Sequence, residues 1–105
     1  MNVKIISGKD LIGLDMTGKS DPYVCIYNRS TMLYKTNKKK NTLNPEWNEQ
    51  FETTDVGIIT FKVFDKDFTG DDFMGEAQLN LSAISKNRSE EFTLTLNHGS
   101  DEKLE

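Results

Sequence analysis

The chain has 105 residues and a formal net charge of -4, and its length suits one domain with a single core. The acidic balance argues against generic nucleic-acid binding, because such domains usually carry a basic excess over one face. A single cysteine, Cys25, excludes an intramolecular disulfide, and no apolar stretch approaches the roughly 20 residues of a membrane span. We therefore expect one cytoplasmic domain that does not bind nucleic acid.

Alternation of apolar and polar residues predicts short strands, in chain order VKIIS (3–7), DPYVCIY (21–27), ITFKVF (59–64) and EFTLTL (91–96). The last of these would turn Phe92, Leu94 and Leu96 inward. Turn clusters such as MTGKSDP, NTLNPE, DFTGDD and NHGSD separate the strands. This spacing predicts an all-β antiparallel sandwich that is nearly free of helix.

The inward positions of these strands define the expected core. Trp47, which follows Pro45, is expected to pack at a sheet edge or at the boundary of the core. The expected core residues are Val3, Ile5, Val24, Ile26, Phe51, Phe61, Val63, Leu79 and Leu81.

Aspartates crowd into two short segments, LDMTGKSDPY and VFDKDFTGDDFMG. Carboxylates that gather in a fold repel one another, so a cation usually neutralises them. Calcium suits irregular loops, because it takes about 6 to 8 oxygen ligands at flexible angles. A preference of aspartate for turns would explain one or two of these residues, but not the five that we expect at the site: Asp15, Asp21, Asp65, Asp67 and Asp72.

The second segment also resembles an EF-hand loop, with Asp65, Asp67, Thr69, Gly70 and Glu76 at positions 1, 3, 5, 6 and 12. An EF-hand loop joins two helices, whereas the residues on both sides of this segment alternate as strands do. We therefore favour a calcium site built by two loops.

Lysines gather between the two acidic segments. Such a run either keeps a turn solvated or binds anions, and both interpretations remain open. The lysines are Lys35, Lys38, Lys39 and Lys40.

The segments SDPYV, KTNKKKNTLNPEWNEQF and VFDKDFTGDDFMGEAQLNL follow one another along the chain in that order. Together they resemble the C2 domain, the calcium-dependent phospholipid-binding module of protein kinase C and synaptotagmin. The resemblance implies an eight-stranded antiparallel Greek-key β-sandwich with calcium loops at one end. It would cover residues 1–97 and leave 98–105 as a polar tail, either appended or the start of a truncated last strand.

The resemblance assigns Asp15 and Asp21 to the first calcium loop and the other three aspartates to the third. Backbone carbonyls near Leu14 and Lys66 would complete the shell of two or three calcium ions. The third loop is one residue shorter than in protein kinase C, so Asp71 is an alternative to Asp72 as the last ligand. We favour Asp72, which directly precedes Phe-Met-Gly.

The implied function is calcium-dependent binding to anionic phospholipid membranes, with recruitment from the cytoplasm when calcium rises. Phosphatidylserine is the expected lipid and phosphoinositides a further one, with the four lysines above as contacts. Met16 and Phe68 occupy loop-tip positions where related domains insert side chains into the headgroups. We expect no enzymatic activity, and the alternative function is a calcium-independent protein-interaction module of the same fold.

The chain begins directly at VKIIS, so an eighth strand would have to follow EFTLTL. If it does not, the domain has seven strands and an open sheet edge. An open edge invites strand exchange or dimerisation.

Overall fold

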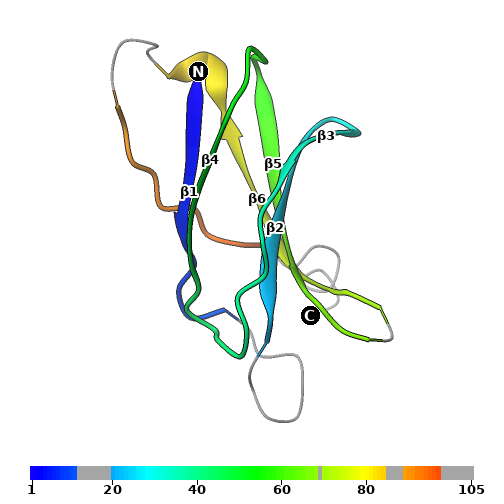
Figure 1. Cartoon of the computed structure of the whole chain (residues 1–105). Helices are drawn as coiled ribbons and strands as arrows, with labels where there is room; N and C mark the ends of the chain where they lie inside the picture. Colours follow the sequence, from blue (N-terminus) through cyan, green and yellow to red (C-terminus); the bar gives the residue numbers. More distant parts are fainter. Residues whose placement is uncertain (12–19, 69, 85–88, 98–105) are drawn as a thin grey trace.

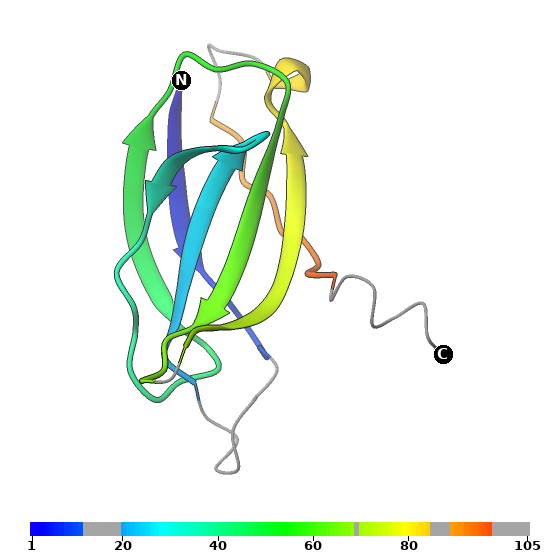
Figure 2. The same ribbon diagram turned by 90° about the vertical axis from the view of Figure 1, so that its right-hand side faces the viewer.

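The computed structural model describes residues 1–11, 20–68, 70–84 and 89–97, which contain six strands and one short 3-10 helix. The strands form two antiparallel sheets, β1-β4 and β3-β2-β5-β6, which face each other (Figures 1 and 2). The expected all-β sandwich is confirmed, with fewer strands in the described residues than the seven or eight anticipated. No helix in the described ranges is long and apolar enough to cross a membrane. The elements are β1 (Asn2–Ser7), β2 (Pro22–Asn28), β3 (Thr31–Lys35), β4 (Glu46–Glu52), β5 (Ile58–Asp65), β6 (Asp72–Asn80) and η1 (Leu81–Ala83).

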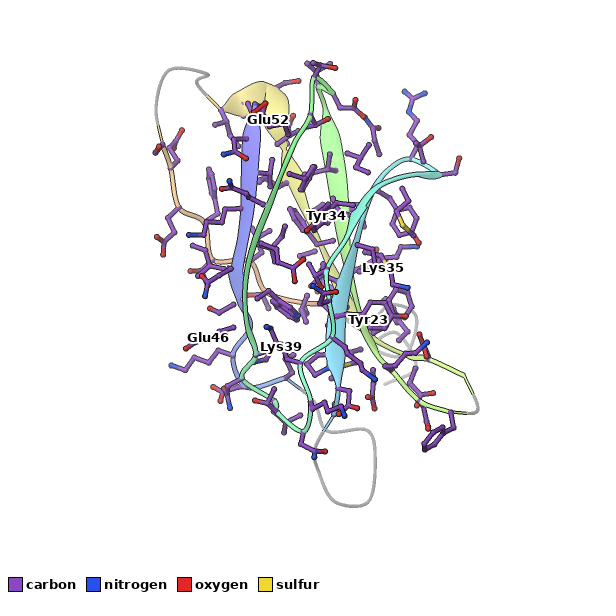
Figure 3. All side chains as sticks on the ribbon, in the orientation of Figure 1. Tyr23, Tyr34, Lys35, Lys39, Glu46 and Glu52 are labelled. Carbon is purple, nitrogen blue, oxygen red and sulfur yellow. The ribbon has the colours of Figure 1, made fainter. Side chains whose placement is uncertain are left out.

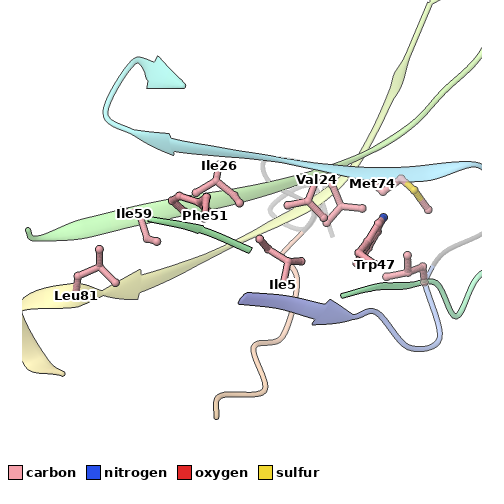
Figure 4. Packing of buried hydrophobic residues seen from close by; sticks show 10 residues of the cluster. Ile5, Val24, Ile26, Trp47, Phe51, Ile59, Met74 and Leu81 are labelled. Atoms are coloured by element: carbon pink, nitrogen blue, oxygen red, sulfur yellow. The ribbon is translucent and has the colours of Figure 1, made fainter. Parts of the chain in front are cut away.

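The core lies between the two sheets (Figure 4). Ile26 on β2 and Ile59 on β5 have no exposed surface, and burying such a side chain contributes about 1.5 to 3 kcal/mol. Every core residue expected from the alternation belongs to this cluster or packs against it. Ile59 and Met74 also belong to the cluster and were not anticipated.

Trp47 lies inside the core rather than at its boundary. Its strand, β4, pairs only with β1 among the described strands, which agrees with an edge position in the sheet. Its side chain is nevertheless only 5% exposed, and the indole Nε1 donates to the carbonyl of Pro22 at 3.2 Å. That hydrogen bond satisfies the indole N–H in the interior and ties β4 to the start of β2 in the opposite sheet.

A bulge shapes the start of β6. The register of β5 and β6 shifts between Val63, which pairs with Gly75, and Phe64, which pairs with Phe73. Gly75 has a φ of 142°, a backbone conformation that favours glycine, and the extra residue Met74 points into the core. Beyond the bulge, Asp72 lies directly opposite Asp65.

The strand expected over 91–96 is not formed. This segment runs beside β6 and joins it at a single bridge, in which Asn97 and Glu76 exchange two backbone hydrogen bonds of 2.8 Å. Residues 76–78 together with Thr93, Leu94, Thr95 and Asn97 line a hollow of about 460 Å³ between the two. Because no further backbone pairing covers the segment, Phe92 and Leu94 remain 44% and 37% exposed, and Leu96 alone of the three packs against the core.

Candidate functional site

Acidic residues at the start of β2, the end of β5 and the start of β6 meet at one end of the sandwich. Asp21 immediately precedes β2, Asp65 ends β5 and Asp72 begins β6. Pro22 pairs with Asp65 across one strand boundary, and Asp65 pairs with Asp72 across the other. Directly opposed residues in an antiparallel sheet have Cβ atoms about 4.5 to 5.5 Å apart, so Asp65 and Asp72 begin their side chains from neighbouring positions. We call Asp21, Asp65, Asp67 and Asp72 the acidic end.

Asp65 is at the centre of the acidic end. Its side chain is only 6% exposed, and its Oδ1 accepts the backbone N–H of Asp21 at 2.9 Å. The backbone carbonyl of Asp21 in turn accepts the N–H of Lys66 at 3.1 Å. The side-chain Oδ1 of Asp21 accepts the N–H of Asn41 at 2.8 Å. A carboxylate that is this buried is costly unless a cation accompanies it, and the described residues place no ion-pair partner beside Asp65.

The connection between β5 and β6 carries three of the expected site residues. Lys66 directs its side chain to Asp71, with 3.9 Å between Nζ and Oδ2, so only its backbone is available to the acidic end. The Oδ1 of Asp67 accepts the N–H of Phe68 at 2.6 Å. Phe68 itself is fully exposed at the tip of this connection.

Asp71 is held by the Tyr23 side chain and by the backbone of Asp67. Its Oδ2 accepts a short hydrogen bond from the Tyr23 hydroxyl, and its Oδ1 accepts the N–H of Asp67 at 3.2 Å. The hydrogen bond from Tyr23 lowers the pKa of the Asp71 carboxyl, with a further contribution from the Asp67 N–H. Burial, together with the Asp71 carboxylate, raises the pKa of Tyr23. Tyr23 therefore stays a neutral donor and Asp71 a charged acceptor.

Three of the expected site residues, Leu14, Asp15 and Met16, lie outside the described residues. The flanks of their segment are placed: the N–H of Leu11 donates to Leu43 at 2.9 Å, and the carbonyl of Ser20 accepts from Thr42 at 2.8 Å. Both flanks are thus fixed to the same connection between β3 and β4, whose Asn41 contacts Asp21.

Within the described ranges, no group of three or more His, Cys, Asp or Glu side chains is arranged to hold a metal ion. The donor chemistry nevertheless fits calcium, since the acidic end offers carboxylate and carbonyl oxygens on irregular connections. Zinc and the softer metals prefer imidazole or thiolate ligands, which the acidic end does not contain.

The lysines divide between two places. Lys35 ends β3 and pairs with Cys25, on the side of the four-stranded sheet that faces away from β1 and β4, which we call the outer face. Its Nζ lies 5.0 Å from the centre of the Tyr23 ring (Figure 3). Lys38, Lys39 and Lys40 lie on the connection between β3 and β4, where Lys38 and Lys40 are exposed and Lys39 is half-buried.

Lys62 on the outer face was not anticipated. It pairs with Cys25 from the β5 side, and its Nζ lies 5.3 Å from the centre of the Tyr27 ring. The alternation in ITFKVF contained the signal, because it turns Lys62 away from the core. Cys25 faces outward between the two lysines yet is only 4% exposed, and burial raises the pKa of its thiol.

Comparison with known proteins identifies a family. The family model of the C2 domain matches residues 1–96. Tricalbin-3 of Saccharomyces cerevisiae is 36% identical over 110 residues, which cover 100% of this chain and 7% of that protein. A calcium-dependent lipid-binding protein of Arabidopsis thaliana is 36% identical over 98 residues, 90% of this chain and 19% of the relative. The chain therefore spans only a small part of these relatives.

Solved structures agree in fold. A C2 domain of plant extended synaptotagmin 1 has a TM-score of 0.82 at 31% identity, over 95% of this chain and 82% of that one. The calcium-bound pair of C2 domains from extended synaptotagmin 2 has a TM-score of 0.66, also at 31% identity, over 76% of this chain and 33% of that one. The second of these structures is the calcium-bound state of another protein with this fold.

Proposed function

The chain belongs to the C2 domain family, and from that premise we propose that it binds anionic phospholipid membranes, phosphatidylserine foremost, in response to calcium. The observation that carries the proposal is the pairing of Asp65 with Asp72 beside Asp21, which gathers carboxylates around a buried member. The similarity to a calcium-bound C2 structure and to a plant protein named for calcium-dependent lipid binding supports it.

Side chains of the acidic end would hold the calcium, together with Asp15 and the backbone carbonyls of Leu14 and Lys66. The five carboxylates carry a charge of about -5, and two or three calcium ions would add about +4 to +6. Binding would therefore remove the repulsion between this end and an anionic membrane. Because lipid phosphate or carboxylate oxygens can complete the coordination of the ions, calcium and lipid would each raise the affinity for the other.

Hydrophobic contact would come from the loop tips. Phe68 is fully exposed beside Asp67, so it is positioned to enter the headgroup region without leaving any packing behind. Met16 would act in the same way from the first loop.

The lysines would add a weaker and salt-sensitive attraction, about 1 kcal/mol for each lysine close to an anionic bilayer. The lipid headgroups that the lysines contact would include those of phosphoinositides. We assign this role to Lys35, Lys38, Lys39 and Lys40.

Co-sedimentation with phosphatidylserine liposomes, in calcium and in chelator, tests the proposal. The wild type is compared with an Asp65→Asn, Asp67→Asn double variant and with Asp55→Asn as a control. Asp55 lies at the opposite end of the sandwich, where it accepts a hydrogen bond from Asn28 at 2.8 Å. We expect binding that needs calcium and the two site aspartates but tolerates the control.

Other outcomes are equally informative. Equal liposome binding in calcium and in chelator would indicate that the lysines, rather than the acidic end, contact the membrane. Absence of binding under every condition would favour the calcium-independent protein-interaction module.

A further inference from the structure

We propose that Asp71 is a positioning residue and not a calcium ligand: its hydrogen bond with Tyr23 fixes the β5–β6 connection to the outer face and thereby holds Asp67 in place for calcium. This inference deepens the proposed function and rests on it. It also decides between Asp71 and Asp72 as the last ligand of the site.

Both carboxylate oxygens of Asp71 are already engaged. Oδ2 accepts from the Tyr23 hydroxyl and lies 3.9 Å from the Lys66 ammonium, and Oδ1 accepts from the N–H of Asp67. Asp72 differs, because its side chain is exposed and makes no hydrogen bond within the described residues. Using Asp71 as a ligand would break contacts that already satisfy it, whereas Asp72 has its oxygens free.

The two aspartates also face in different directions. Asp72 is paired with Asp65 and shares its side of the sheet. The next residue pair, Phe64 and Phe73, lies on the outer face together with Tyr23, which pairs with Phe64. By bonding to the Tyr23 hydroxyl, Asp71 turns toward the outer face and away from the acidic end.

Tyr23 is a rigid anchor for this contact. Its ring is only 6% exposed and stacks on Phe64 with 5.6 Å between ring centres, and Phe64 in turn meets Phe73 edge-on at 5.8 Å. Lys35 covers the ring of Tyr23. The hydroxyl is thus held at one point, and Asp71 transmits that position to the backbone of Asp67.

Tyr23→Phe is the sharpest variant, since it removes the hydroxyl and keeps the ring with its contacts to Phe64 and Lys35. Tyr27→Phe is its matched control, on the same face and strand. In calcium-free protein, we expect amide hydrogen exchange at Asp67 to accelerate about tenfold in Tyr23→Phe and to stay unchanged in the control. By calorimetry, calcium affinity should fall about threefold to tenfold in Tyr23→Phe.

Conservative variants of the two aspartates separate positioning from ligation. Asn can still accept the Asp67 N–H and bond to Tyr23, so calcium affinity in Asp71→Asn should stay within about threefold of the wild type. Asp72→Asn removes a charged ligand, and its affinity should fall much further, by more than about tenfold.

Equal losses in Asp71→Asn and Asp72→Asn would overturn the inference by making Asp71 a ligand. Unchanged Asp67 exchange in Tyr23→Phe would overturn it even if the wild type binds calcium normally. A wild type that binds no calcium would instead reject the proposed function and this inference with it. Circular dichroism checks that each variant folds. If Tyr23→Phe does not fold, Asp71→Asn supplies the test.

Discussion

The backbone N–H of Asp21 donates to the carboxylate of Asp65, 44 residues further along the chain, at 2.9 Å. This contact joins the start of β2 to the end of β5, so it brings Asp21 of the first acidic segment beside Asp65 of the second. It also places a nearly buried carboxylate next to two others without a described cation to balance it.

Calcium should therefore stabilise the fold. A ligand at about 100 times its dissociation constant adds about 2.7 kcal/mol to the free energy of unfolding. We expect the Tm of the wild type to rise with calcium and that of Asp65→Asn to be insensitive to it, because the asparagine offers one oxygen and no charge. Thermal unfolding in calcium and in chelator measures both. A wild-type Tm that ignores calcium would contradict the expectation.

Neighbouring isoleucines on β5 should differ sharply in their contribution to stability. Ile59 is fully buried, so Ile59→Ala should lower the free energy of unfolding by about 2 to 5 kcal/mol. Ile58 is 53% exposed, and Ile58→Ala should change it by about 0.5 kcal/mol or less. Urea denaturation followed by circular dichroism compares the two variants. Equal losses would show that the core is not where the structure places it.

Phe68→Ala should weaken calcium-dependent liposome binding by about tenfold to a hundredfold, the equivalent of losing about 1.5 to 3 kcal/mol of burial. Stability in solution should not change, because the side chain is fully exposed there. Val56→Ala, 65% exposed on the connection between β4 and β5, is the control. Unchanged liposome affinity of Phe68→Ala would exclude insertion at this position.

Cys25 should react slowly with thiol reagents. Burial raises the pKa of its thiol, so at pH 8 the reactive thiolate is scarcer than in an unfolded chain, and reactivity should increase as the pH rises toward that pKa. Colorimetric thiol titration in buffer and in urea gives the two rates. Equal rates would mean that Tyr23, Tyr27 and the two lysines do not cover the sulfur.

An unpaired sheet edge should support self-association. Among the described strands, β1 pairs with β4 alone, and the segment 89–97 leaves apolar side chains exposed. We expect a dimer whose population grows with protein concentration in analytical sedimentation. A monomer at every concentration would count against it.

Local signals made much of the acidic end predictable. Pro22 marks the start of β2 just after Asp21. The alternation over 59–64 correctly predicted that β5 ends near Asp65. The alternation also identified the core, because each inward position meets another across the sandwich.

The remainder depends on partners distant in sequence. The bulge at Met74 is a property of the β5–β6 pairing, and the bond between Tyr23 and Asp71 links residues 48 positions apart, so neither has a local signature. The pattern at 91–96 favoured a strand, but a strand requires a hydrogen-bonded neighbour, which the described chain supplies only at Asn97.

Trp47 buried between the sheets has an optical consequence. It is the chain's one tryptophan, and its indole N–H donates a hydrogen bond to the carbonyl of Pro22, the residue next to Asp21. The fluorophore is thus separated from a proposed calcium ligand by one peptide unit and a hydrogen bond. The molecule contains its own spectroscopic reporter of the end that would meet the membrane, with no label attached.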